Sequence, residues 1–197
     1  MKLLLHVCCA PCSTAVLAVL RNEGIKPTLF WYNPNIHPFT EYRSRRDTLV
    51  QYAKTLDLPL IMEDLYGLRE FTAALAQEAG GFLTSAAKEQ RCSFCYRLRM
   101  EKTAAAARQG GFDCFSTTLF VSPYQDHEKL RKTAETAENC GGPSGQGAAG
   151  QGAALYYQDF RPFFREGQEE ARRLGLYRQK YCGCIFSEEE RYVTNSG

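Results

Sequence analysis

Three short cysteine clusters, far apart in the chain, constrain the fold more than any other feature of this sequence. Seven of the nine cysteines fall into H-V-C-C-A-P-C, R-C-S-F-C-Y and Y-C-G-C, at Cys8, Cys9, Cys12, Cys92, Cys95, Cys182 and Cys184. Only the fold can bring these thiols together. A pocket rich in thiols is usually a metal or redox site, because a thiolate is both a soft ligand and a nucleophile.

The bulk properties indicate one cytoplasmic domain. The chain has 197 residues, 44% of them hydrophobic, and a net charge of +2 that is too small to indicate a nucleic-acid binder by itself. No signal peptide is visible, and no apolar run approaches the roughly 20 residues of a membrane span, so we expect no membrane partner. In a reducing compartment, clustered cysteines favour metal binding or catalysis over a structural disulfide framework.

Strand-like and helix-like segments alternate along the sequence. Strands are predicted at 2–7, 27–32, 59–63, 114–119 and 155–160, and helices at 13–22, 41–56, 68–79, 92–109, 125–138 and 163–174. This alternation predicts an α/β fold over residues 1–197, with a Rossmann-like parallel sheet covered by helices on both faces, and a cysteine-containing C-terminal extension. Residues 139–154, mostly Gly, Ala, Gln and Ser, are predicted to form a flexible surface loop.

Several polar residues follow predicted strands, and the carboxyl ends of parallel strands form one rim where active sites lie. His37 and His127 are candidates for substrate contact or proton transfer, although a solvated loop histidine is an equal alternative. Tyr124 is a third candidate acid. The candidate substrate contacts in these segments are Asn33, Asn35 and Ser122. His6, inside an apolar strand, is more simply a core histidine.

The cysteine spacing leaves three kinds of site open. Cys9, Cys12, Cys92 and Cys95 form C-x-x-C…C-x-x-C, a four-thiolate signature that suits either zinc or an iron–sulfur cluster. A structural zinc would leave Cys8, Cys182 and Cys184 unused, which favours the cluster. Neighbours on an extended segment point opposite ways, so Cys8 is expected to face away from Cys9, toward a second centre or a substrate.

Cys182 and Cys184 can complete that second centre or form a labile disulfide. Thiol–disulfide exchange through Cys9 and Cys12 is the third alternative, and it would leave the other clusters idle. Cys114 and Cys140 are assigned no role.

Basic residues gather in two places. Arg43, Arg45 and Arg46 lie in one predicted helix, and Arg161, Arg165, Arg172, Arg173, Arg178 and Lys180 lead to the last cysteine pair, interleaved with aromatic residues. Such a mixture suits phosphate contacts and base stacking, although a solvated helix face explains it nearly as well. Arg43, Arg161 and Arg178 are our candidate substrate contacts.

The sequence resembles the QueH family of epoxyqueuosine reductases over nearly its whole length. The matching motifs are H-V-C-C-A-P-C (6–12), Y-N-P-N-I-H-P (32–38), E-Y-x-x-R (41–45), R-C-x-x-C-Y-x-x-R (91–99), F-S-T-T-L (115–119), S-P-Y-x-x-H (122–127), D-F-R (159–161) and G-L-Y-R-Q-x-Y-C-G-C (175–184). Their combination is specific, whereas each motif alone would be weak.

The resemblance implies a nucleotide-alpha-hydrolase-like α/β fold and the last step of queuosine biosynthesis, in which the epoxide of epoxyqueuosine in tRNA is reduced to an alkene. It implies a [4Fe–4S] cluster, an additional mononuclear iron, no cobalamin, and an electron donor that the sequence does not identify. Cys9, Cys12, Cys92 and Cys95 are then expected to hold the cluster. Cys8, Cys182 and Cys184 are expected to serve the second iron or a redox thiol pair. The competing interpretation is a structural-zinc or thiol-redox protein that binds nucleic acid.

Overall fold

The computed structural model describes residues 1–82, 87–139 and 153–193. The strands are β1 (Leu3–His6), β2 (Thr28–Trp31), β3 (Leu60–Met62), β4 (Cys114–Thr117) and β5 (Ala154–Leu155). The helices are α1 (Ala10–Asn22), α2 (Phe39–Thr55), α3 (Leu68–Glu78), α4 (Lys88–Gln109), α5 (His127–Asn139), α6 (Phe164–Arg173) and α7 (Ile185–Tyr192). Cys140 and nearly all of the glycine-rich segment lie outside the described residues.

The five strands form one parallel sheet in the order β3-β2-β1-β4-β5. This order is that of the doubly wound nucleotide-binding folds, with β1 in the middle. The predicted α/β class, the parallel sheet and the C-terminal cysteine-containing extension are confirmed. The nucleotide-alpha-hydrolase-like assignment stays a prediction.

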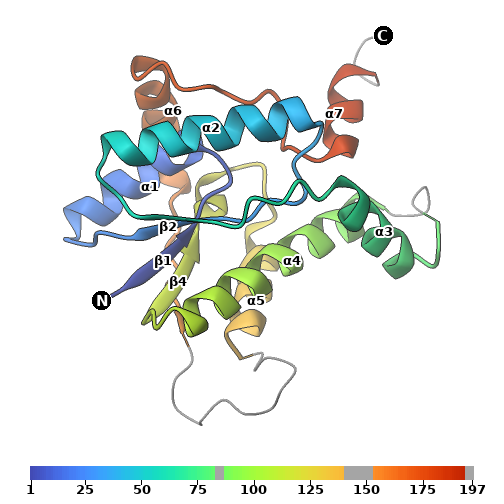
Figure 1. Cartoon of the computed structure of the whole chain (residues 1–197), viewed down its shortest axis with the longest axis horizontal. Coiled ribbons are helices and arrows are strands. Elements are labelled where there is room, and N and C mark those ends of the chain that lie inside the picture. The colour runs from blue at the N-terminus through green and yellow to red at the C-terminus, as the bar shows by residue number, and fades with distance from the viewer. Residues whose placement is uncertain (83–86, 140–152, 194–197) are drawn as a thin grey trace.

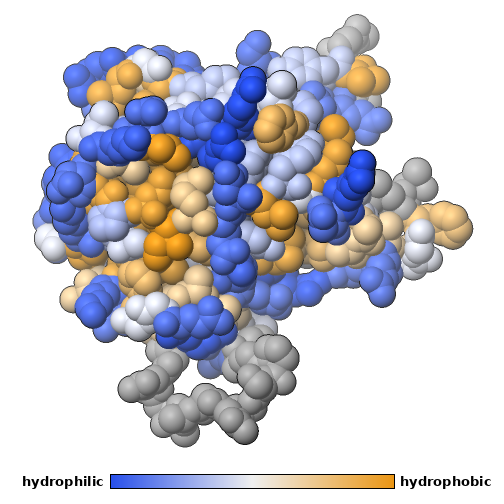
Figure 2. Space-filling model, in the orientation of Figure 1, coloured by the Kyte–Doolittle hydropathy of each residue, from blue (hydrophilic) through white to orange (hydrophobic). Residues whose placement is uncertain are grey.

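Helices cover both faces of the sheet (Figure 1). On one face α1 packs against α2 and α6, and on the other α4 packs against α5. Every residue of β1 is buried, as expected for a central strand covered on both sides. On the face shown in Figure 2, apolar side chains reach the surface in patches separated by a hydrophilic band. No helix among the described residues combines the length and the apolar character needed to cross a membrane.

Three predicted boundaries are wrong in ways that affect the site. Helix α1 begins at Ala10 because Cys9 caps it, accepting from the Cys12 amide, and because Pro11 suits a first helical turn. Helix α4 begins at Lys88, so its cysteines lie one turn inside the helix. Strand β4 ends at Thr117, whose hydroxyl accepts from the Leu119 amide and starts a 3₁₀ turn.

The last strand is also shorter than predicted. Strand β5 pairs with β4 only through Ala154 and Leu155. The chain then leaves the sheet, and Tyr157 packs edge-on against Phe120 instead. Aromatic character at 156–160 therefore reflects packing outside the sheet.

Candidate functional site

Three cysteines meet at the turn between β1 and α1, and we call Cys8, Cys9 and Cys12 the turn group. Their sulfur atoms all lie within 4.8 Å of one another, and all three residues are buried. The Cys8 and Cys9 sulfurs are 3.9 Å apart, so the expectation that they face opposite ways is wrong. The early start of α1 explains the difference, because the chain stops being extended directly after Cys9.

The three thiols of the turn group shift one another's pKa in opposite directions. Hydrogen bonds from the thiols of Cys12 and Cys9 lower the pKa of Cys8 well below its usual range. Burial raises the pKa of Cys9, and the hydrogen bond to Cys8 raises the pKa of Cys12. The Thr118 hydroxyl also lies 3.5 Å from the Cys8 sulfur. A lowered pKa favours the thiolate form of Cys8, and a thiolate with two further sulfurs beside it is suited to bind a soft metal.

The segment at 176–184, which we call the strap, crosses the turn group. The amide of Gln179 donates to the sulfurs of Cys9 and Cys12, at 3.1 and 3.5 Å. Sequence reasoning missed Gln179. Its only signal was its place in the motif G-L-Y-R-Q-x-Y-C-G-C.

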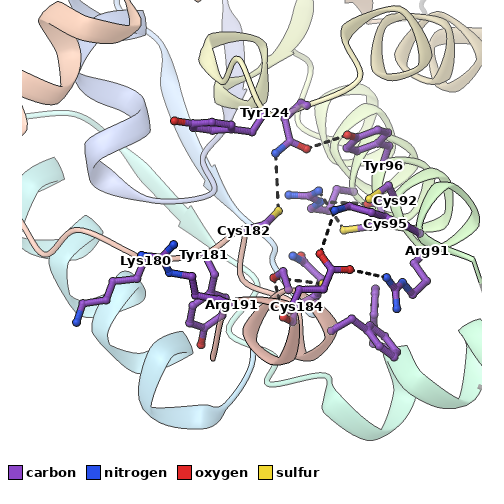
Figure 3. A pocket seen from close by; sticks show the side chains of 18 residues that line it. Arg91, Cys92, Cys95, Tyr96, Tyr124, Lys180, Tyr181, Cys182, Cys184 and Arg191 are labelled. Atoms are coloured by element: carbon purple, nitrogen blue, oxygen red, sulfur yellow. Dashed lines mark hydrogen bonds and ion pairs between the residues drawn. The ribbon is translucent and has the colours of Figure 1, made fainter. Parts of the chain in front are cut away.

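The remaining four clustered cysteines form a second set, which we call the strap group. Cys92 and Cys95 project from α4, while Cys182 and Cys184 come from the strap, and all four line one cavity of about 480 Å³. Figure 3 shows the sulfurs of Cys92, Cys95 and Cys182 pointing into this hollow. Burial raises the pKa of Cys95 to about 12, and the charges of the neighbouring thiols add to that rise.

The thiols are therefore grouped differently from the C-x-x-C pairing in the sequence. Cys9 and Cys12 gather with Cys8, and the α4 pair faces the strap pair. Every described cysteine is a free thiol, so of the two alternatives for Cys182 and Cys184 the disulfide is not formed.

A second cavity of about 730 Å³ adjoins the first and reaches the turn group through Cys8 and Cys12. The two cavities share lining residues, among them Asn35, Arg99 and Cys182. Basic side chains also line the larger cavity, and these are Arg45, Arg99, Arg165, Arg172, Arg178, Lys180 and Arg191. Both thiol groups thus open onto one continuous hollow with a basic wall.

Arg99 is a buried cation between the two groups. It is 2% exposed, and its guanidinium donates at 3.1 Å to both the sulfur and the carbonyl of Cys95. Burial opposes its charge, and the nearby ionisable groups that would favour it include Cys95, Cys182 and Cys8. Within the described residues no ion pair joins it to a carboxylate. A buried guanidinium is costly unless an anion compensates it, and here its sulfur partner is the Cys95 thiol, which would supply that anion on binding a metal as a thiolate.

The three candidate acids are placed differently. Tyr124 is 83% exposed and lines both cavities. His37 is buried against Tyr66 and Phe71, and burial lowers its pKa to about 4, so its ring is neutral near pH 7. His127 is buried, and its Nε2 lies 2.9 Å from the Ser122 carbonyl. Neither histidine lines either of these two cavities.

Half of the candidate substrate contacts reach the hollow. Asn35 lines both cavities with a buried Oδ1 that has no hydrogen-bond partner, and Ser122 and Arg178 line the larger one. The other three lie elsewhere. Asn33 donates to the Val7 carbonyl at 2.9 Å, Arg43 lies over Phe39, and Arg161 pairs with Asp159 at 2.6 Å.

Known proteins resemble the chain over nearly its whole length. The family model described as Epoxyqueuosine reductase QueH matches residues 3–190. Proteins of that name from Dehalococcoides mccartyi and Acinetobacter baylyi are each 34% identical, over 97% and 94% of this chain and 94% and 80% of the relatives. The one from Thermotoga maritima is 32% identical over 95% of this chain and 91% of its own length. Because the matched residues include both thiol groups and the strap, the chain belongs to the epoxyqueuosine reductase QueH family.

Proposed function

We propose that this protein reduces the epoxide of epoxyqueuosine in tRNA to an alkene, using a [4Fe–4S] cluster and an additional mononuclear iron. One observation carries the proposal: a three-sulfur group and a four-thiol group open onto adjoining cavities with a basic wall. Family membership supports epoxyqueuosine reduction, and the thiol arrangement supports a metal centre.

The donor set fits such a centre. Thiolates are the common ligands of [4Fe–4S] clusters, and the hydrogen bonds that lower the pKa of Cys8 favour the thiolate form in the turn group. Since the two groups open onto adjoining cavities, one cluster can take ligands from both. We propose Cys9, Cys12, Cys92 and Cys95 as its ligands, which leaves Cys8, Cys182 and Cys184 for the second iron or for thiol redox chemistry.

The reaction consumes two electrons and two protons and releases the epoxide oxygen as water. When bound, the cluster supplies electrons singly and the adjacent iron acts as a Lewis acid on the oxygen. An external electron donor must reduce the centre after each turnover. Among the protein groups, Tyr124 is our proposed proton donor, since of the three candidate acids it alone lines the cavities.

The remaining lining residues suit a nucleotide. The unpaired Oδ1 of Asn35 can accept from a hydroxyl or amine of the modified base. Arg178 and its basic neighbours can neutralise phosphates, so tRNA affinity should fall as salt rises. An affinity that does not respond to salt would remove this surface from the proposal.

The decisive experiment is anaerobic purification followed by iron, sulfide and zinc analysis and turnover of epoxyqueuosine-containing tRNA. We expect a brown protein with about four or more irons and matching sulfide per chain. A colourless protein with one tightly held zinc, no sulfide and no turnover would overturn the proposal. It would favour the structural-zinc, nucleic-acid-binding alternative.

A further inference from the structure

We infer that Glu41 and Arg45 form a buried clamp that fixes the strap, and so determines where Gln179, Cys182 and Cys184 stand over the two thiol groups. The E-Y-x-x-R motif that contains the clamp has no part in the chemistry proposed above. The positioning role rests on the proposed function only because it assumes that Cys182 and Cys184 take part in the reaction.

The clamp binds the main chain of the strap through hydrogen bonds to carbonyl groups. Arg45 and Glu41 lie one turn apart on α2, and Arg45 Nε donates to Glu41 Oε1 at 2.6 Å. The two remaining guanidinium nitrogens donate to the carbonyls of Tyr181 and Cys182, each at 3.0 Å. Both clamp residues are buried, at 7% and 2% exposure. One side chain therefore holds two successive peptide groups at the point where the strap enters the strap group.

Further contacts hold the strap on either side of that grip. Glu41 also accepts a hydrogen bond from the Tyr177 hydroxyl. The Tyr181 hydroxyl donates to the His37 carbonyl at 2.8 Å, and the His37 amide donates to the Gly183 carbonyl at 2.7 Å. Gln179 thus lies between Tyr177 and Tyr181, which these hydrogen bonds hold in place. Cys182 lies between Tyr181 and Gly183, which are held in the same way.

Gly183 shows how closely the clamp approaches. It adopts φ +129, and a β-carbon there would lie 3.0 Å from Arg45 Nη1. This backbone conformation favours glycine, and a side chain here would also press on the guanidinium. Its small size lets the strap lie directly on the clamp.

Positioning explains this arrangement better than stability does. Replacing a buried ion pair by apolar side chains of similar size is often neutral or stabilising, so such a pair gives little net stability. The planar fork of Arg45 instead offers directional donors to two carbonyls, which lysine cannot match. The clamp therefore specifies one placement of Cys182 relative to the thiols of α4.

The test uses the full-length, metal-free chain with Arg45→Lys and, as matched control, Arg46→Lys, the neighbouring arginine whose partners are the half-exposed Asp47 and Asp64. Amide hydrogen exchange is measured by mass spectrometry. We expect exchange in the strap to rise about tenfold or more in Arg45→Lys, with β1 and α4 unchanged. The control should match the wild type. Unchanged strap exchange in Arg45→Lys overturns the inference, and so does an equal rise throughout the chain, which indicates general destabilisation.

Gly183→Ala provides a second variant that leaves both clamp side chains intact. It should release the strap to a similar extent, and it decides the matter if Arg45→Lys fails to fold. Titration with Cd²⁺ adds a spectroscopic readout, because absorption between cadmium and thiolate grows with the number of bound sulfurs. Both variants should lose the same part of this absorption as a Cys182→Ala, Cys184→Ala double variant. Retention of the full wild-type absorption would count against the clamp.

These readouts need neither tRNA nor turnover. If Arg45→Lys releases the strap but the wild-type protein has no reductase activity, the clamp stands and the proposed function fails. If the wild-type protein reduces epoxyqueuosine but strap exchange is unchanged in Arg45→Lys, the proposed function stands and the clamp fails.

Discussion

The turn group and the strap group are both made of cysteines, but they differ in how far apart those cysteines lie in the sequence and in how deeply they are buried. The three turn cysteines come from five consecutive residues, are all buried, and have sulfur atoms within 4.8 Å of one another. The strap cysteines come from segments about ninety residues apart, and Cys182 is exposed while Cys92 and Cys184 are half-buried. The first group is built by a single turn, whereas the second depends on the contacts that place the strap over α4.

This difference suggests a division of labour. A buried, preformed thiolate set can retain a metal tightly, because little reorganisation is needed on binding. Thiols on a separate, more accessible segment suit exchange with a substrate or a reductant. Substitutions in the two groups test whether the turn group mainly retains the metal and the strap thiols mainly take part in exchange.

Cys9→Ala should produce the largest loss. It removes a buried sulfur and the helix cap of α1 together, so we expect bound iron and turnover to fall together, by about 100-fold or more. Iron analysis and single-turnover assays on the anaerobic protein measure both. Cys114→Ala is the control, because Cys114 is a buried cysteine of β4 outside both groups. Full turnover by Cys9→Ala would contradict the proposed centre.

Cys182→Ala should distinguish the strap group from the turn group, because it should lower turnover more than it lowers bound iron. Because this thiol lies on the exposed segment, we expect turnover to fall about 10- to 100-fold while most of the iron remains bound. The same two measurements apply. If iron is lost as completely as in Cys9→Ala, the distinction between the groups fails, and an unchanged rate would remove Cys182 from the mechanism.

The comparison also shows what sequence reasoning could reach. The alternation of strands and helices predicted the parallel sheet, since its signal is local periodicity repeated along the chain. The C-x-x-C spacing indicated one set made of Cys9, Cys12, Cys92 and Cys95, and it did not predict that Cys9 and Cys12 gather with Cys8 while the α4 pair faces the strap. That grouping depends on where α1 begins and on the path of the strap, which a hydrogen bond from Arg45 to a distant carbonyl decides. Gln179 and Arg99 were missed because each acts through contacts made only in the folded chain.

Arg99→Met should have an intermediate effect, because it removes the buried cation that lies between the two groups. The sulfurs of Cys95, Cys182 and Cys8 lose a compensating charge. We expect metal affinity to fall about 10- to 100-fold, and the reduction potential of the bound centre to become more negative. Redox titration and metal competition measure these changes.

Arg97→Met is the control, since Arg97 lies on the same helix but is half-exposed and paired with Glu78. Arg99→Met with an unchanged potential and affinity would mean that Arg99 only fills space. Equal effects in the two variants would point to a general change in α4.

The smallest expected effect is a pH dependence of stability that His37 introduces beside the strap. Its ring is buried against Tyr66 and Phe71, and burial lowers its pKa to about 4, against about 6.5 in an unfolded chain. Between these values the unfolded state binds a proton that the native state does not. The free energy of unfolding must therefore fall as pH drops from about 6.5 to about 4, and His37 contributes no further change below that.

Urea unfolding of the metal-free chain across this range checks the sign. His6, whose pKa burial also lowers to about 4, lies at the end of β1 beneath the turn group and should give a slope of its own. His37→Phe should therefore reduce the wild-type slope without abolishing it. Hydrogen exchange near pH 5 should then show the wild-type strap opening before β1, because most strap residues are at least partly exposed whereas β1 is the buried centre of the sheet. If β1 opens first, the strap group is not the less stable of the two regions.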